Sequence, residues 1–133
     1  MPYLLDTNIC IYIIRKQPAT VLDKFNSVTP GELALSIITV AELEFGARKS
    51  LNPIKNLSAL NKFLIPFNLL EFDHAAAMEY GIIRNSLEAK GTPIGPLDTL
   101  IAAHAKSLQY ILVTNNEREF SRVEELTIEN WVR

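Results

Sequence analysis

Short runs of strand-forming apolar residues alternate with helical segments along the whole chain, and this alternation limits its fold more than any other feature. Strands are expected at residues 3–6, 33–38, 68–72, 110–114 and 126–128. Helices are expected at residues 9–14, 19–26, 40–50, 54–64, 74–90, 97–108 and 117–122. Because parallel strands are usually joined by crossover helices, this order predicts a three-layer α/β/α fold whose central sheet is mostly parallel and has about five strands.

The chain has the size and composition of one globular domain. It has 133 residues, of which 48% are hydrophobic and 21% are charged, and neither a repeat nor a long linker divides it. We therefore expect a single domain spanning residues 1–133. The single cysteine, Cys10, fits a reducing compartment, and Asp6 interrupts the apolar run that a signal peptide would need. A cytoplasmic location is expected.

Net charge alone does not identify a partner. The formal net charge is −2 and the sequence pI is about 5.7, which argues against a nucleic-acid binder. A cation held by several of the acids would reverse the sign of the local potential, however. The charge balance therefore excludes neither a nucleic-acid substrate nor a protein partner.

Acidic and amide side chains occur where the expected strands end. Asp6 ends the first strand, and Glu42 lies in the first turn of the helix after the second strand. Asp98 opens the helix that leads into the fourth strand, which Asn116 and Glu119 follow directly. Because the carboxyl ends of parallel strands meet at one edge of a sheet, where ligands bind, we expect these side chains to converge. Gathered carboxylates raise one another's pKa and so call for a compensating cation or a chemical use.

These side chains suit Mg²⁺ or Mn²⁺, because they offer hard oxygen atoms without a partnered His or Cys. Such an ion can bridge a phosphate oxygen, activate a water and stabilise the charge on a departing oxygen, which is the chemistry of phosphodiester hydrolysis. Plainer roles also fit the sequence. Thr39 and Glu42 have the spacing of a capping box, and Asp6 and Asp98 can each be an acid that favours a helix N-terminus.

Four segments resemble, in order and spacing, the successive motifs of PIN-domain ribonucleases, and more narrowly those of the VapC toxins of bacterial toxin–antitoxin pairs. They read LDTN at 5–8, ITVAELEFG at 38–46, PIGPLDTLIAAHA at 93–105 and VTNNEREF at 113–120. The match extends from residue 1 to residue 131 and covers essentially the whole chain. The resemblance implies a PIN-like fold in which Asp6, Glu42 and Asp98 form an acidic core that binds Mg²⁺ or Mn²⁺.

One position departs from the family pattern. Many PIN domains carry an aspartate where this chain has Asn116, whose amide can ligate a metal or position a water but supplies no charge. Glu119 lies one helical turn further along and is able to supply the missing carboxylate. A turn residue at 116 and a surface acid at 119 are the plainer interpretations, and the sequence leaves the number of metal sites open.

The resemblance also implies what the protein acts on and assembles with. It implies the toxin component of a type II toxin–antitoxin pair, an endoribonuclease that hydrolyses RNA phosphodiester bonds with a metal-activated water. Close relatives cut the anticodon loop of initiator transfer RNA, so the expected substrate is transfer RNA and the expected effect is a stop in translation. A homodimer is implied too, together with a cognate antitoxin that wraps the apolar helices, sends an arginine into the acidic site and forms a DNA-binding complex with the toxin.

Other functions fit the residues less well. A receiver domain needs a lysine where Thr114 stands, and a phosphatase of the Asp-x-Asp type needs an acid at Asn8. A catalytically weakened PIN scaffold that acts as an RNA- or antitoxin-binding module is the alternative, motivated by Asn116. Three aromatic residues are able to stack on RNA bases, although core packing is commoner for each of them: Tyr12, Phe45 and Tyr80. Arg84 is one of several basic candidates for phosphate contacts.

Overall fold

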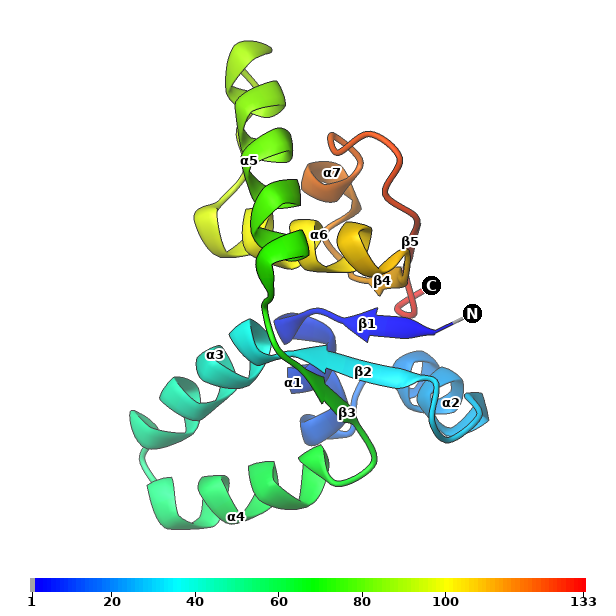
Figure 1. The fold of residues 1–133 in the computed structure, drawn as a ribbon. Coiled ribbons are helices and arrows are strands. Elements are labelled where there is room, and N and C mark those ends of the chain that lie inside the picture. The colour runs from blue at the N-terminus through cyan, green and yellow to red at the C-terminus, as the bar shows by residue number, and fades with distance from the viewer. Residues whose placement is uncertain (1) are drawn as a thin grey trace.

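Neighbouring strands of the central sheet all run in the same direction (Figure 1). The computed structural model describes residues 2–133. Its strands are β1 (Tyr3–Leu5), β2 (Leu33–Ser36), β3 (Asn68–Leu70), β4 (Ile111–Val113) and β5 (Ile128–Glu129). They form one sheet in the order β3-β2-β1-β4-β5. The predicted parallel sheet of about five strands is therefore confirmed, with β1 at its centre.

The helices that connect these strands begin where local chemistry favours a start. They are α1 (Thr7–Arg15), α2 (Ala19–Ser27), α3 (Ile37–Arg48), α4 (Pro53–Leu64), α5 (His74–Ala89), α6 (Pro96–Leu108) and α7 (Glu117–Phe120). Asp6, Ser36 and Asp73 cap α1, α3 and α5, because each side chain accepts a hydrogen bond from an amide of the first turn. In α4 and α6 a proline occupies the first turn, where its missing N–H costs nothing.

Helix α3 begins earlier than the sequence pattern predicts. The pattern places a cap at Thr39, whereas the cap is Ser36, whose Oγ accepts a hydrogen bond from the Ile38 amide at 3.1 Å. Thr39 is buried inside the helix with 0% of its surface exposed. A capping box between Thr39 and Glu42 is therefore wrong, because Thr39 does not occupy the cap position. Glu42 is left for another role.

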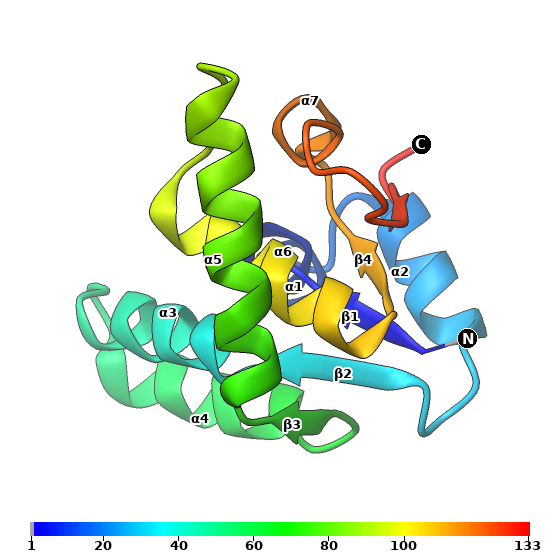
Figure 2. The same cartoon turned by 45° about the horizontal axis from the view of Figure 1, so that its top comes forward.

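Successive residues of a strand point to opposite faces of the sheet, and they enter two separate hydrophobic clusters. Leu5 and Leu35 pack in a cluster with residues of α1, α2, α3 and α4. Leu4 and Ala34 pack in a second cluster with residues of α5, α6 and α7. Figure 2 shows the sheet lying between these two groups of helices, so the three-layer prediction is confirmed. Among the helices of residues 2–133, none is both long and apolar enough to cross a membrane.

Candidate active site

Asp6 lies at the carboxyl end of the central strand. Its amide donates a hydrogen bond to the Val113 carbonyl at 3.0 Å, which extends the β1–β4 ladder, and its Oδ1 accepts the Ile9 amide at 2.9 Å. The residue is only 6% exposed. Burial raises the pKa of the Asp6 carboxyl and the charge of Glu42 raises it further, whereas hydrogen bonds from Thr114 and Ile9 act in the opposite direction. Asp6 Oδ1 caps α1, so the plain role predicted for Asp6 is real, and the hydrogen bond with Thr114 ties the same carboxyl to the residue after β4.

Glu42 reaches the same edge from α3. The Thr7 hydroxyl donates a hydrogen bond to Glu42 Oε1 at 2.8 Å, which ties the first turn of α1 to α3 across 35 positions of sequence. The charge of Glu42 raises the pKa of both Asp6 and Asp98, so the three carboxyl groups interact. Glu42 is therefore a member of the acidic cluster and not part of a helix cap.

Asp98 and Glu119 form the most strongly coupled pair of the cluster. The pKa of Asp98 is raised from 3.8 to about 6, first by burial, then by a hydrogen bond shared with Glu119 and by the charges of Glu119, Asp6 and Glu42. A hydrogen bond between two carboxyl groups requires a proton on one of them. In the absence of a cation, Asp98 therefore keeps its proton to a pH well above the usual range of an aspartate.

Asn116 holds Glu119 in position. Its Nδ2 donates a hydrogen bond to Glu119 Oε2 at 3.1 Å, and its backbone amide donates to Thr114 Oγ1 at 2.9 Å. The amide side chain thus stands where many PIN domains have an aspartate and connects to the glutamate one turn further along. Asn116 is also the residue that precedes α7, and Glu119 is half-buried beside Asp98.

The structure thus brings Asp6, Glu42, Asp98, Asn116 and Glu119 to one edge of the sheet. Within residues 2–133, no three His, Cys, Asp or Glu side chains are already close enough together to hold a metal ion. The chemistry of the donor set fits a hard divalent cation, because the available atoms are oxygens and a cation can replace the proton that Asp98 and Glu119 share.

Two threonines take part in the site although the sequence analysis assigns them no role there. Thr7 holds Glu42, and Thr114 bridges the Asp6 carboxyl and the Asn116 amide. The one signal for Thr114 is its place at the end of the fourth strand, where the other site residues gather. No pattern in the sequence pairs Thr7 with Glu42, because that contact depends on how α1 and α3 pack.

Comparison with known proteins places the chain among nucleases. The family model described as "PIN domain" matches residues 3–126. The protein named tRNA(fMet)-specific endonuclease VapC of Shigella flexneri is 44% identical over 131 residues, which cover 98% of each chain. Ribonuclease VapC2 of Haemophilus influenzae is 45% identical over 132 residues, which cover 99% of each chain.

Solved structures with the same fold come from toxin–antitoxin complexes. The DNA-bound VapBC complex of Salmonella typhimurium contains a chain that superposes with a TM-score of 0.93 at 42% identity and covers 98% of both chains. A chain of VapBC2 from Rickettsia felis, bound to a DNA fragment from its promoter, gives a TM-score of 0.92 at 39% identity, with 98% of this chain and 99% of that chain covered.

Replacing Asp98 by Asn should stabilise the metal-free protein at neutral pH, because one charge leaves the cluster. The folded-state pKa of Asp98, about 6, exceeds its ordinary value of 3.8. Asp98 therefore costs the folded protein nothing below about pH 4, and the free energy of unfolding falls as the pH rises to about 6. The shift corresponds to about 3 kcal/mol, which screening of a half-exposed group reduces to about 1 kcal/mol.

Thermal melting in EDTA tests this prediction. We expect Asp98→Asn to raise Tm by several degrees at pH 7 and to leave it unchanged at pH 4. Asp23→Asn, at an exposed position of α2, is the matched control and should change Tm at neither pH. An unchanged Tm for Asp98→Asn at pH 7 would show that the cluster carries no net repulsion.

Proposed function

This chain belongs to the PIN-domain family and, within it, is related to the VapC ribonucleases, and from this premise we propose that it is the toxin of a type II toxin–antitoxin pair. Its activity is that of a divalent-metal-dependent endoribonuclease that hydrolyses RNA phosphodiester bonds. The observation that supports the proposal most directly is the convergence of Asp6, Glu42, Asp98 and Glu119 at the carboxyl edge, where the charges of the other three acids raise the pKa of Asp98. A fold that only needed stability would not gather these charges.

Asp6, Glu42 and Asp98 are the residues that would hold Mg²⁺ or Mn²⁺. When bound, the cation would activate a water and stabilise the charge on the departing oxygen of the RNA. The chain itself supplies orientation, since the Ile9 amide and the Thr114 hydroxyl fix Asp6 and the Thr7 hydroxyl fixes Glu42. These donors are neutral, and they orient the carboxylates without cancelling their charge.

Glu119 completes the acidic set in place of the aspartate that many PIN domains carry at position 116. The Asn116 amide holds Oε2 of Glu119, which places this carboxyl beside Asp98. A carboxylate placed beside the proposed metal ligands is in position to take up a proton from an attacking water. Asn116 is in this proposal a positioning residue, and Glu119 is the one that exchanges the proton.

Transfer RNA is the proposed substrate, and initiator transfer RNA is the first candidate within it. The support is the relatives named tRNA(fMet)-specific endonuclease in Shigella flexneri and Salmonella typhimurium. Hydrolysis of this RNA would stop translation. Such an activity belongs in the cytoplasm, where translation takes place.

Cleavage assays with the purified chain, freed of antitoxin, test the activity. We expect discrete transfer RNA fragments in Mg²⁺ or Mn²⁺ and none in EDTA. Asp6→Asn and Asp98→Asn should each lower the cleavage rate by about 100-fold or more. Loss of a residue that only supports a metal ligand costs up to about 100-fold, and these two residues are proposed ligands themselves. Asp23→Asn is the control for a lost surface charge and should cleave as the wild type does.

Two outcomes would contradict the proposal. Full activity in either site variant or in EDTA would exclude the metal site. Intact transfer, ribosomal and messenger RNA in every reaction, together with tight RNA or antitoxin binding, would favour the weakened scaffold that acts as a binding module.

The proposed antitoxin would occupy a groove between α1, α3 and α4. This groove has a volume of about 400 Å³ and is lined mostly by small and apolar side chains, among them Ile11, Ile14, Leu43 and Gly46. Glu42 is also among the lining residues, so a segment lying in the groove contacts a member of the acidic cluster. An arginine at the end of such a segment would pair with the carboxylates. The solved relatives that contain VapB, VapC and DNA support a partner that also forms a DNA-binding complex with the toxin.

Gly46→Leu should release the toxin from its antitoxin while preserving cleavage. A side chain at Gly46 meets no atom within 4 Å, so leucine would extend freely into the groove and displace the antitoxin segment. Folding should not suffer, because replacing a helical glycine gains up to about 1 kcal/mol of helix propensity. Gly46→Ala gives the same gain without filling the groove and is the control. Equal inhibition of both variants by the co-expressed cognate antitoxin would remove this groove from the proposal.

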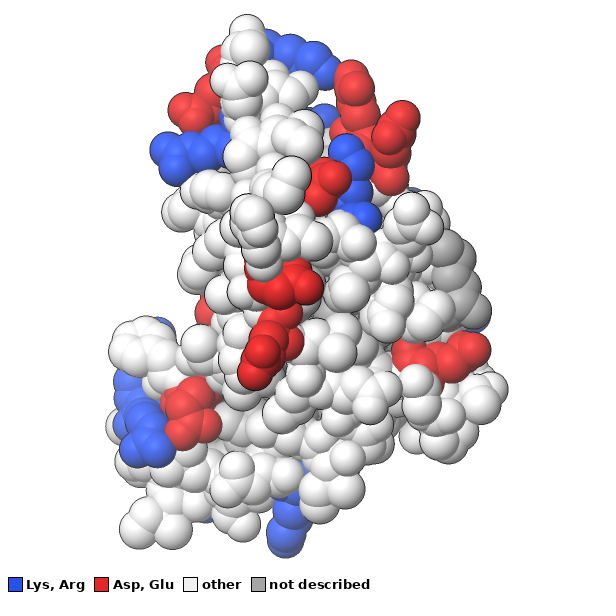
Figure 3. All heavy atoms as spheres, viewed as in Figure 1, with Lys and Arg blue, Asp and Glu red and all other residues white. Residues whose placement is uncertain are grey.

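We place the proposed homodimer interface on α5. Met78 and Ile82 are spaced by one helical turn and are 58% and 57% exposed. Figure 3 shows an uncharged strip along α5 on the face viewed there. Side chains of this size on one helical face gain stability when a second copy covers them.

Light scattering after size-exclusion chromatography tests the dimer. We expect the wild type at twice the chain mass of 14.9 kDa and the double variant Met78→Lys, Ile82→Lys at the single mass. Ile65→Lys, at an isoleucine that lies beyond the end of α4 and is 80% exposed, is the control and should remain dimeric. A wild type of single mass would exclude the homodimer, and a double variant that stays dimeric would move the interface elsewhere.

A further inference from the structure

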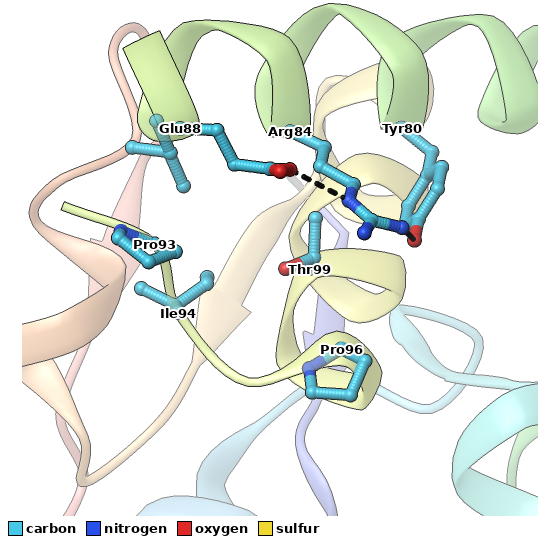
Figure 4. Close-up of a pocket in the computed structure, with 8 residues that line it drawn as sticks. Tyr80, Arg84, Glu88, Pro93, Ile94, Pro96 and Thr99 are labelled. Atoms are coloured by element: carbon cyan, nitrogen blue, oxygen red, sulfur yellow. Dashed lines mark hydrogen bonds and ion pairs between the residues drawn. The ribbon is translucent and has the colours of Figure 1, made fainter. Parts of the chain in front are cut away.

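A second hollow lies beside the acidic site, across the first turn of α6. It has a volume of about 280 Å³ and is bounded by α5, by the loop that precedes α6 and by α6 itself. Figure 4 shows Tyr80 and Arg84 of α5 on one side, with Pro93, Ile94 and Pro96 opposite them. Those five residues define what we call the Tyr80–Arg84 pocket, which shares no residue with the acidic cluster described above.

Two hydrogen bonds orient Arg84 in the wall of this pocket. Its Nε donates a hydrogen bond to Glu88 Oε2 at 2.9 Å, and its Nη1 donates to the Tyr80 hydroxyl at 2.9 Å. The guanidinium carbon lies 6.0 Å from the centre of the Tyr80 ring. No residue among 2–133 accepts a hydrogen bond from Nη2, so part of the guanidinium fork is available to a ligand. A planar cation oriented in this way suits a phosphate oxygen or the acceptor edge of a base.

The opposite wall of the pocket is rigid and apolar. Pro93 and Pro96 flank Ile94 on the loop, and their rings limit the backbone conformations that the loop can adopt. The Pro93 carbonyl also accepts a hydrogen bond from Arg122 Nη1 at 3.0 Å, which ties the loop to the segment after α7. An apolar wall facing an aromatic ring and a cation is the kind of surface on which a nucleobase stacks.

The pocket communicates with the acidic site around the start of α6. Pro96 lies two residues before Asp98, and the two side chains project from opposite sides of the helix, which is about 10–12 Å wide. Gly95 lies between the pocket and the carboxylate, and a Cβ placed there would be 3.7 Å from Asp98 Oδ2. Gly95 therefore places no side chain over Asp98 on this path, along which a strand of RNA can pass.

We propose that the Tyr80–Arg84 pocket receives the base of a nucleotide that flanks the cleaved bond, and that Arg84 donates hydrogen bonds to the same nucleotide. This inference rests on the proposed endoribonuclease function. It makes Tyr80 and Arg84 determinants of where the RNA is cut, because a base held at a fixed distance from Asp98 sets the register of the strand.

Size and charge favour a nucleotide over other occupants. The pocket is slightly smaller than the 300–1,000 Å³ typical of sites for whole small molecules, and this suits a single base. The Arg84–Glu88 pair has exposures of 58% and 51%, and an ion pair so exposed is weak enough for a phosphate to compete with. The positive charge of Arg84 also attracts the phosphates of RNA, which the acidic cluster alone does not.

The test crosses variants of the pocket with RNA that lacks single bases. A transfer RNA that the wild type cleaves is prepared with an abasic nucleotide at each position flanking the cut, one position per substrate. For the wild type, one of these abasic substrates should lose about tenfold in kcat/KM, the effect of losing one stacked base. Arg84→Gln and Tyr80→Leu should each lower kcat/KM for the intact substrate by a similar factor, and leucine keeps an apolar side chain at the half-buried position 80. In these variants the abasic nucleotide should lower kcat/KM no further.

Two further measurements separate the proposal from its alternatives. Arg48→Gln removes an Arg–Glu pair of the same spacing on α3 and should leave cleavage and the abasic effect unchanged. Fluorescence anisotropy of the labelled RNA in EDTA should show weaker binding to Arg84→Gln than to the wild type, a readout that requires neither metal nor cleavage.

The outcomes are distinct. If every abasic nucleotide lowers kcat/KM by the same factor in the Arg84 and Tyr80 variants as in the wild type, the pocket does not bind a base. The endoribonuclease function still stands in that case. A change in oligomeric state or in antitoxin binding, with no effect on RNA, would assign the pocket to a protein partner and overturn the inference. If the wild type cleaves no RNA in either metal, the proposed function itself fails, and the anisotropy measurement then decides whether RNA binds the pocket at all.

Discussion

The site depends on the parallel pairing of β1 with a strand on each side. β2 and β4 both run parallel to β1, so the carboxyl ends of all three strands lie at one edge of the sheet. The register is fixed because Leu4 and Leu5 enter different hydrophobic clusters, and a shift by one residue would expose one cluster and bury the wrong side chain in the other. Packing of two leucines thus determines where the Asp6 carboxyl points. Apolar packing, and not an electrostatic interaction, sets the position of this residue.

Gathering the carboxylates at that edge has an electrostatic cost, which the surrounding structure offsets only in part. The Ile9 amide, the Thr7 hydroxyl and the Asn116 amide each donate to one carboxylate, and all three donors are neutral. Neutral donors fix geometry and lower the repulsion slightly, while most of the negative charge remains. The raised pKa of Asp98 is the residual cost. Such a balance is expected where a fold gives up stability for chemistry, since a salt bridge in the same place would stabilise the chain and leave no charge for a cation.

The surroundings of the site differ on its two sides, and the difference suits two kinds of contact. On the side of α1, α3 and α4 lies a groove that is lined mostly by small and apolar side chains and also by Glu42. This groove is suited to a helix or an extended segment of another protein. On the side of α5 and α6, a pocket with an arginine and an aromatic ring ends near Asp98 across the bare backbone of Gly95. The acidic cluster lies between them, so an inhibitor and a substrate can approach it from different directions and still compete for the same carboxylates.

The sequence by itself determined the element types, the parallel sheet, and the gathering of Asp6, Glu42, Asp98, Asn116 and Glu119 at one edge, because hydrophobic periodicity and the position of a residue within its strand or helix are local properties. Only the tertiary structure decided which side chains hold those acids. Ser36 and not Thr39 caps α3, since helix starts shift by a residue or two with packing. The Thr7–Glu42 hydrogen bond depends on how α1 and α3 are placed, and no local pattern encodes a contact across 35 residues. The raised pKa of Asp98 likewise depends on burial and on three other acids at once, a sum of distances that exists only in the folded chain.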